Sequence, residues 1–304
     1  MAKPFVKWAG GKSKVLEQLV PLLPKNITSN EMIYVEPFVG GGAMTFYMLK
    51  RFPNIKRVII NDINKDLINC YDVVARYPEE LIRELQFLEK RYYSLKSEDR
   101  KRLFLYIREE YNMTHEYTRD KIYLAAMFIF LNKTCFNGLY RVNKSGMFNT
   151  SFGKYENPLI CDYETILEDS KLLSNVSMDS VDFEDILSII PSYEKEVFFY
   201  LDPPYYPVSD TSCFTEYAKG GFDEGSNKRL LDFCYMLNGF KYKFLLNNSY
   251  VKNNDEEMSL FEKMYSDFNI SHISAKRSIN SDGQKRGTIT ELAICNYYDM
   301  IGNV

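Results

Sequence analysis

Seven short runs rich in apolar and β-branched residues are spread along this 304-residue chain, and helical patterns fill most of the intervals between them. Strands that alternate with helices usually pair in parallel, because a crossover helix returns the chain to the same edge of the sheet. The pattern predicts a doubly wound α/β fold with a mostly parallel seven-stranded sheet and ligands at the strand carboxyl ends. The expected strands span residues 32–37, 57–62, 176–179, 197–202, 243–248, 270–275 and 291–297.

The interval between the second and third expected strands is far too long for a simple crossover. It contains helical patterns at residues 78–91, 97–111 and 121–131, so we expect an inserted, mostly helical domain. The predicted boundaries assign residues 1–66 and 166–304 to the sheet domain and residues 67–165 to the insert. Within the insert, residues 136–149 predict a β-hairpin that turns at residues 143–146.

Asp202, Pro203, Pro204 and Tyr205 directly follow the apolar run at residues 197–201. An exocyclic amine of a base is a poor nucleophile, and acceptors aimed at its hydrogens stabilise the geometry in which it attacks a methyl donor. Asp202 offers a carboxylate oxygen and Pro203 a backbone carbonyl, which is fixed because proline holds φ at about −65°. Tyr205 can stack on the base. The alternative is that two prolines only end a buried strand, and this short motif alone does not decide between them.

A glycine-rich turn, residues 38–42, connects the first expected strand to a helical pattern at residues 43–51. Such a turn lets a ligand approach the backbone closely at a helix N-terminus. Asp62 ends the next strand, where a carboxylate can accept hydrogen bonds from ribose hydroxyls. The turn lacks the G-x-G-x-x-G pattern of nicotinamide sites, so an adenosyl cofactor without a pyrophosphate fits better.

The N-terminal stretch contains Gly11-Lys12-Ser13, which looks like the end of a P-loop, but Val6 stands where that motif requires glycine. A nucleotide triphosphate is therefore disfavoured. Trp8, the single tryptophan, could cover an adenosyl group, and Lys12 could pair with a ligand carboxylate. For Trp8 in isolation, an ordinary core position is the alternative.

The order of these motifs resembles that of the Dam-type DNA adenine-N6 methyltransferases, in the alpha group of amino methyltransferases, over essentially the whole chain. The matching motifs are K-W-A-G-G-K at 7–12, V-E-P-F-V-G-G-G at 35–42, N-D-I-N at 61–64, F-N-G-L-Y-R at 136–141, D-P-P-Y at 202–205 and R-S-I-N-S at 277–281. The resemblance implies an S-adenosylmethionine-dependent catalytic domain, a target-recognition insert, double-stranded DNA as partner, and GATC as the first expected target. It also implies that the target adenine is flipped out of the duplex, because its amino group is inaccessible inside the stack.

The resemblance also implies a cofactor site, in which Asp182 and Phe183 meet the adenine ring of the cofactor. The full set of implied cofactor residues is Trp8, Lys12, Pro37, Phe38, Gly40, Asp62, Asp182, Phe183 and Asp202.

The hairpin supplies the implied DNA contacts. Arg141 would read a guanine through two parallel hydrogen bonds, which discriminate by about 1–3 kcal/mol. Leu139 would touch a thymine methyl, Phe136 would wedge into the base stack, and Asn137 would contact the backbone or an orphaned base. Lys7 would contact the outer guanine, and the implied set also contains Lys144, Arg277 and Ser278. Two departures from the family pattern are Ser151, where proline is common, and Phe136, where tyrosine is more usual.

A net charge of −3 argues at first against a DNA partner, because phosphate neutralisation supplies much of the affinity for a duplex. The charge is unevenly distributed, however. Residues 121–155 include no Asp or Glu but five basic residues, and a second basic cluster lies at residues 276–286. Two basic surfaces predict a nucleic-acid cleft. The alternative is a solvated face that lacks acidic residues by chance.

Six scattered cysteines and two histidines argue against a structural zinc ion and for reduced cytosolic thiols. The resemblance implies the cytoplasm of a bacterium, at the nucleoid, or of a phage-infected cell as the location. The chain has no apolar run near the ~20 residues that a membrane span needs. We therefore expect neither a metal nor a membrane partner.

Several alternatives stay open. The same chemistry could act at another adenine-containing site, or the scaffold could serve as a catalytically silent DNA-binding regulator. Cytosine-N4 methyltransferases usually carry S-P-P-Y, and protein-glutamine or ribosomal-RNA methyltransferases usually carry N-P-P-Y. A restriction endonuclease acting on the same site is a further expected partner if the enzyme protects its host.

Residues 207–225 form an expected loop that is rich in Ser, Thr and Gly. By analogy with lids elsewhere, we expect this loop to close over the base.

Overall fold

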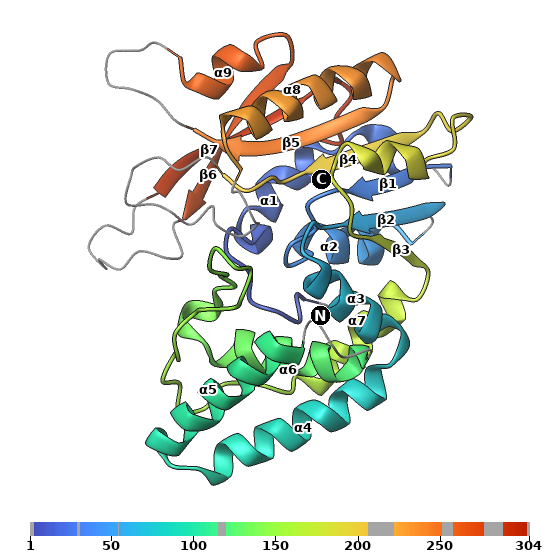
Figure 1. Ribbon diagram of the computed structural model, residues 1–304. Helices are drawn as coiled ribbons and strands as arrows, with labels where there is room; N and C mark the ends of the chain where they lie inside the picture. The colour runs from blue at the N-terminus through green and yellow to red at the C-terminus, as the bar shows by residue number, and fades with distance from the viewer. Residues whose placement is uncertain are drawn as a thin grey trace.

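The structure is a computed structural model of the chain. It describes residues 3–28, 31–53, 55–114, 120–205, 222–250, 258–276 and 288–302. Within these residues, seven strands form one sheet in the order β3-β2-β1-β4-β5-β7-β6 (Figure 1). The strands are β1 (Ile33–Glu36), β2 (Arg57–Asn61), β3 (Val176–Asp179), β4 (Val197–Leu201), β5 (Lys243–Ser249), β6 (Asn269–Lys276) and β7 (Thr288–Cys295). The predicted seven-stranded α/β sheet is confirmed.

The first five strands of the chain are mutually parallel, and β7 runs antiparallel to both β5 and β6. Every residue of β1 and β4 is buried, because helices cover both faces of the sheet. This double burial explains why these strands read as unbroken apolar runs in the sequence. The sheet order places the ends of β1, β4 and β5 side by side, and these ends carry the site described below.

Alternate side chains of the central strands enter two separate cores. Tyr34, Phe198 and Tyr200 pack in the core beneath α1 (Leu16–Leu19), α2 (Ala43–Arg51), α3 (Lys65–Arg76) and α7 (Tyr163–Leu173). Val35 and Phe199 pack in the core beneath α8 (Glu224–Gly239) and α9 (Leu260–Met264). The period of two follows from the pleat of a strand. Figure 1 shows α8 and α9 on one side of the sheet and α1 and α2 on the other.

Local sequence sets where five of these helices begin. Asn64, Asp120, Asp162, Asp223 and Ser259 each accept a hydrogen bond from a backbone N–H in the first helical turn that follows. Such side chains satisfy donors that have no partner inside the helix. The N-D-I-N motif thus combines a strand end with the cap of α3.

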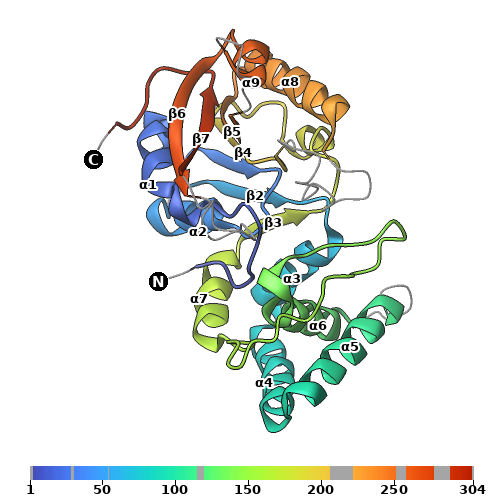
Figure 2. The ribbon, with the colours of Figure 1, turned by 90° about the vertical axis from the view of Figure 1, so that its left-hand side faces the viewer.

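The insert contains α4 (Pro78–Ser94), α5 (Ser97–Thr114) and α6 (Lys121–Thr134), which group at one end of the molecule (Figure 2). Helix α6 is buried along most of its length, because α3, α4 and α5 surround it. One hydrophobic cluster continues from the sheet into this helix. The predicted domain boundaries fall within α3 and α7, and they stay predictions.

The structure confirms the predicted turn of the hairpin at residues 143–146, but the prediction that its first strand begins at residue 136 is wrong. Asn143 N–H donates to the Met147 carbonyl at 2.9 Å, and Gly146 N–H donates to the Asn143 carbonyl at 2.8 Å. Around this turn, Val142 and Phe148 form an isolated bridge, and a second isolated bridge joins Cys135 and Phe152 further from the turn. Residues Phe136–Gly138 instead form a 3-10 turn, η4, in which the φ angles of Asn137 and Gly138 are 56° and 65°. Positive φ angles at consecutive residues exclude a regular strand.

The remaining short 3-10 segments are η1 (Lys12–Lys14), η2 (Val20–Leu22), η3 (Lys25–Thr28) and η5 (Asp185–Ile189). Segment η1 carries Lys12, and η5 follows the Asp182-Phe183 pair. Two elements of the site are therefore held by tight turns rather than by long helices.

Candidate active site and recognition segment

The glycine-rich turn after β1 closes against the N-terminal motif. Gly40 has a φ angle of +47°, and a Cβ atom there would lie 2.8 Å from Cδ1 of Trp8. At Gly42, where φ is +75°, a Cβ atom would lie 2.4 Å from the hydroxyl of Tyr71. Neither position accepts a larger residue, because both the backbone angle and the space exclude one. The two sequence motifs therefore form one wall.

Asp62 holds the glycine-rich turn from the end of β2. Its carboxylate accepts hydrogen bonds from the backbone N–H groups of Gly40, at 3.0 Å, and Asn64, at 2.9 Å. Desolvation raises the pKa of Asp62 to about 6, although these two donors act in the opposite direction. A carboxylate in this setting can also accept hydroxyl hydrogens of a sugar.

Asn61 joins the loops that follow β1 and β3. Its Nδ2 donates to the carbonyls of Pro37 and Val181, both at 3.0 Å, and its Oδ1 accepts from the Val181 N–H at 2.9 Å. The side chain is buried, so these bonds are shielded from water. Asn61 therefore holds the loops that carry Phe38 and Asp182 next to each other, at the carboxyl end of β2.

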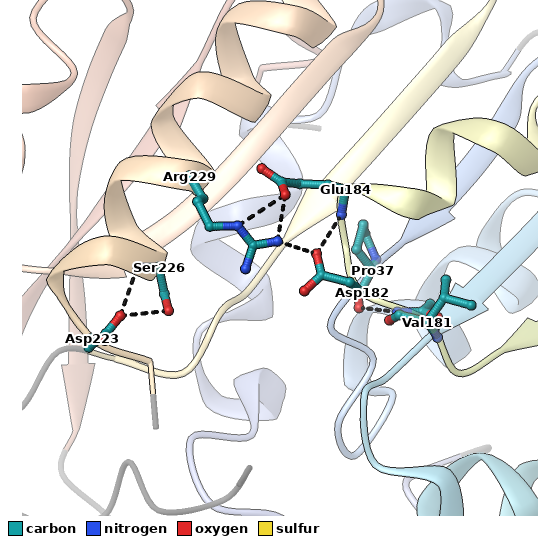
Figure 3. Close-up of polar contacts among 8 residues, drawn as sticks. Pro37, Val181, Asp182, Glu184, Asp223, Ser226 and Arg229 are labelled. Carbon is teal, nitrogen blue, oxygen red and sulfur yellow. Dashed lines mark hydrogen bonds and ion pairs between the residues drawn. The ribbon is translucent and has the colours of Figure 1, made fainter. Parts of the chain in front are cut away.

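Aromatic rings line the edge near β3. The ring centroid of Phe183 lies 5.3 Å from that of Phe38 and 6.4 Å from that of Phe222. The neighbouring Asp182 carboxylate accepts from the Glu184 N–H at 3.1 Å and forms an ion pair with Arg229 of α8 (Figure 3). The structure thus brings Phe38, Asp182 and Phe183 together, and the contact of Asp182 and Phe183 with the adenine ring of the cofactor stays a prediction.

At the end of β4, Lys12 meets the D-P-P-Y motif. Its ammonium group lies 2.9 Å from Oδ1 of Asp202 and 4.3 Å from the ring centroid of Tyr205, and its side chain is only 6% exposed. Desolvation raises the pKa of Asp202 to about 6, the Lys12 charge opposes that increase, and the Glu291 charge adds to it. Lys12 here pairs with a carboxylate of the protein, and its contact with a ligand carboxylate stays a prediction.

Two residues that the sequence did not single out hold Tyr205. The tyrosine hydroxyl donates to Oε2 of Glu291 at 2.8 Å, and Asn247 Nδ2 donates to that hydroxyl at 2.7 Å and to Glu291 Oε2 at 2.9 Å. Burial raises the pKa of Tyr205 well above its usual value, so the phenol stays protonated. A polar residue inside an apolar strand was the available signal: Asn247 follows Phe244–Leu246 in β5, and Glu291 precedes an apolar run in β7.

Glu36 is a second buried acid that the sequence reasoning passed over. It is 2% exposed and accepts hydrogen bonds from the hydroxyls of Tyr34, at 2.6 Å, and Thr45. Burial raises the pKa of Glu36 to about 8, so this carboxyl is mostly protonated at pH 7. It therefore adds little negative charge beside Asp202 at neutral pH.

Asn132 of α6 connects the N-terminal motif, residues 7–12, to residues 136–149, which we call the recognition segment. The Asn132 side chain accepts from Lys7 N–H at 2.8 Å and donates to the carbonyls of Lys7, at 2.8 Å, and Gly138, at 3.0 Å. Phe136, next to this junction, is 51% exposed, and Asn137 is exposed as well. Lys7, Phe136 and Asn137 are thus neighbours on one surface.

The hairpin displays two basic residues. Arg141 is exposed, and its Nε donates to Oδ1 of Asn149 at 2.8 Å across the hairpin. Lys144 is exposed at the turn. Leu139 is buried, at 9% exposure, which leaves little of its surface for the predicted contact with a thymine methyl.

Some predicted residues lie outside the described ranges. These are Arg277 and Ser278, most of the second basic cluster, and most of the expected lid at 207–225. In the described residues, no three or more His, Cys, Asp or Glu side chains gather as a metal site would require. No helix among them combines the length and the apolar character needed to cross a membrane.

Comparisons with known proteins identify the family of this chain. Residues 8–279 match the family model of D12 class N6 adenine-specific DNA methyltransferases. The type II methyltransferase M.MjaIII of Methanocaldococcus jannaschii is 45% identical over 97% of this chain and 99% of its own length. The type II methyltransferase M1.LlaDCHI of Lactococcus lactis subsp. cremoris is 35% identical over 97% of this chain and 95% of its own. A DNA adenine methylase of Vibrio cholerae is 29% identical over 95% and 94%. The chain therefore belongs to the D12 class of N6 adenine-specific DNA methyltransferases.

Proposed function

We propose that this enzyme methylates N6 of one adenine in a short duplex target, with GATC as the first candidate, after the adenine has left the base stack. The observation that carries the proposal is the junction of Lys12, Asp202 and Tyr205 at the end of β4, beside the glycine-rich turn. This junction places a carboxylate and an aromatic ring at one edge of the sheet, beside the turn at residues 38–42 that would form a wall of the adenosyl site.

The family implies S-adenosylmethionine as the methyl donor, and the residues present fit it. Gly40 carries no side chain and packs against the Trp8 indole, so the turn and the tryptophan would form one wall of the cofactor site. Asp62 would accept the ribose hydroxyls, the contacting rings of Phe38 and Phe183 would together present an apolar surface to the adenine ring, and Asp182 would accept from its amino group. Trp8, Lys12, Pro37, Gly40 and Asp202 complete the proposed binding set. When bound, S-adenosylmethionine supplies an electrophilic methyl group on a sulfonium sulfur.

The target base would be held by the D-P-P-Y motif. Lys12 contacts Oδ1 of Asp202, so we assign Oδ2 and the Pro203 carbonyl to the two amino hydrogens of the adenine. Pro204 restricts the backbone at this elbow. Tyr205 would stack on the base, and Glu291 and Asn247 keep its ring in place. These acceptors stabilise the amine as it becomes tetrahedral, which is transition-state stabilisation by groups that are already oriented.

Sequence recognition would come from the hairpin and the adjoining N-terminal residues. Arg141 would read a guanine, Phe136 would fill the gap left by the flipped adenine, and Lys7 and Asn137 would contact the surrounding duplex. Lys144 would neutralise a phosphate. Insertion of the Phe136 ring into that gap would offset part of the unstacking cost of flipping.

The type II designation of the two relatives above favours a role in modification beside a restriction endonuclease that acts on the same site. The genes adjacent to this one test that role, because a modification enzyme of this kind needs an endonuclease in the same cell.

The proposed activity is tested by transfer of a labelled methyl group to a duplex with one GATC and to four duplexes with one base pair changed in each. We expect transfer to the GATC duplex only. Asp202→Asn should reduce turnover by about a hundredfold or more, whereas Asp267→Asn, at an exposed carboxylate remote from the site, should leave it unchanged. Transfer without GATC preference would refute the recognition assignment. Cofactor binding with no transfer to any DNA would point to a silent regulator.

A further inference from the structure

Arg229 of α8 contacts both members of the Asp182-Phe183 pair, which we propose to bind the adenine of the cofactor. Its Nη2 donates to Oδ1 of Asp182 at 2.6 Å and to Oε2 of Glu184 at 2.5 Å, and its Nε donates to the same Glu184 oxygen at 3.0 Å. Its guanidinium carbon lies 5.0 Å from the ring centroid of Phe183. Figure 3 shows the side chain reaching from α8 to both carboxylates.

This geometry fixes the rotation of the Asp182 carboxylate. Oδ1 accepts two hydrogen bonds, from Arg229 and from the Glu184 N–H, so the plane of the carboxylate is set from two directions. A guanidinium is planar and presents its donors in a rigid fork, so it orients a carboxylate better than a lysine ammonium does. Oδ2 takes part in neither of these bonds and is then held in one orientation.

The contact matters more for position than for stability. The side chains of Arg229, Asp182 and Glu184 are 45%, 37% and 32% exposed, and ion pairs this accessible to water add little to folding stability. Arg229 also offsets repulsion between two carboxylates that lie two residues apart in the loop after β3. Its loss would release the loop without creating a cavity in the core.

We propose that Arg229 is a positioning residue for cofactor specificity: it aims Oδ2 of Asp182 at the exocyclic amino group of the cofactor's adenine and holds Phe183 beside the ring. This inference rests on the proposed cofactor site. A carboxylate held in this orientation accepts from an amino group and repels a carbonyl oxygen, so the site would select adenine over hypoxanthine.

The test compares the binding of S-adenosylhomocysteine and S-inosylhomocysteine by calorimetry, which requires no methyl transfer. The wild-type protein should prefer the adenosyl compound, and Arg229→Met should reduce that preference by about tenfold. Asp182→Asn should reduce it similarly, and the double variant should lose little more, because both residues act through one contact. Arg229→Lys should restore only part of the preference, since one ammonium replaces a fork.

Lys56→Met is the matched control, because it removes an exposed ion pair with Glu194 at 2.9 Å that lies at the start of β2. It should keep the wild-type preference, and the melting temperatures of all variants should stay close together. Loss of preference in Asp182→Asn together with a wild-type preference in Arg229→Met would overturn the inference and leave the proposed function standing. Failure of the wild-type protein to bind S-adenosylhomocysteine would overturn both.

Discussion

The chemistry of Asp202 depends on its neighbours rather than on its type. Burial raises its pKa to about 6, and two nearby groups act on it in opposite directions: Lys12 lowers the pKa, and Glu291 raises it. The acceptor form of the residue is the ionised carboxylate. The pair formed with Lys12 therefore keeps Asp202 mostly ionised at neutral pH despite its burial.

From this balance we predict the pH dependence of turnover at saturating cofactor. The rate should rise with pH through about 6, as Asp202 loses its proton. Lys12→Met removes the charge that lowers the pKa, so the rising limb should move to higher pH by about one unit or more. Glu291→Gln removes a charge that raises the pKa, so the limb should move to lower pH. The limb position is read from pH–rate profiles. Shifts of both variants in the same direction would contradict the assignment.

At the scale of single elements, turns and strand ends hold the functional groups, while the helices support them. The hairpin illustrates this, because Asn143 and Gly146 close its turn and Asn149 lies opposite Arg141. The Asn149 N–H also donates to the Arg141 carbonyl at 2.9 Å, so the pairing of the backbone does not depend on the Asn149 side chain. The hairpin therefore does not need the side-chain hydrogen bond between Asn149 and Arg141, and this bond can orient Arg141 for base recognition.

We predict that Asn149→Ala weakens sequence preference and leaves the hairpin intact. A guanidinium without its partner loses orientation, which should cost about 0.5–1.5 kcal/mol, or about three- to tenfold in preference at the base pair that Arg141 reads. Lys144→Ala is the control, because loss of a phosphate contact should weaken binding to all duplexes alike and reduce the salt dependence. The comparison uses binding titrations with duplexes changed at one pair. If Asn149→Ala kept the full preference for the base pair while Arg141→Ala lost it, the proposed orienting role of Asn149 would be refuted.

At the scale of the whole molecule, the hydrophobic core is continuous from the sheet into the helical insert, and buried amides link segments that are distant in the chain. Asn61 joins the loops after β1 and β3, and Asn132 joins the N-terminal motif to the recognition segment. Asn132 is 2% exposed. The relative position of the catalytic edge and the hairpin therefore depends on a few buried polar contacts.

We predict that Asn132→Ala lowers the free energy of unfolding by about 1–3 kcal/mol, since it leaves buried backbone groups of Lys7 and Gly138 without partners. It should also raise KM for DNA, because Lys7 and Phe136 lose their common anchor. Asn227→Ala is the control: Asn227 is 3% exposed, and its Nδ2 donates to the Asp223 carbonyl at the start of its own helix. Urea unfolding and steady-state kinetics would measure both effects. An equal KM in the two variants would count against the anchoring role.

The strands, the starts of α2, α4, α5 and α6, and the D-P-P-Y, glycine-turn and N-terminal motifs were predictable from the sequence, because each depends on residues that are close together in the chain. Apolar runs encode β1 and β4, and Asp120 caps the start of α6. The 3-10 turn at Phe136 was missed, because apolar and polar residues alternate there as they do in a strand. Only the left-handed angles at Asn137 and Gly138 distinguish it.

Only the tertiary structure decided which charges meet. The sequence places Lys12, Asp202 and Glu291 on three separate segments, and the sheet order brings them together at one edge. The same holds for Arg229 with Asp182 and for Asn149 with Arg141. A pKa and the orientation of a carboxylate depend on distances to groups elsewhere in the chain and on exclusion of water, and no local pattern encodes those distances. The sequence by itself determined the strands and the chemical groups at their ends, and the packing of the sheet and its loops determined how those groups are charged and aimed.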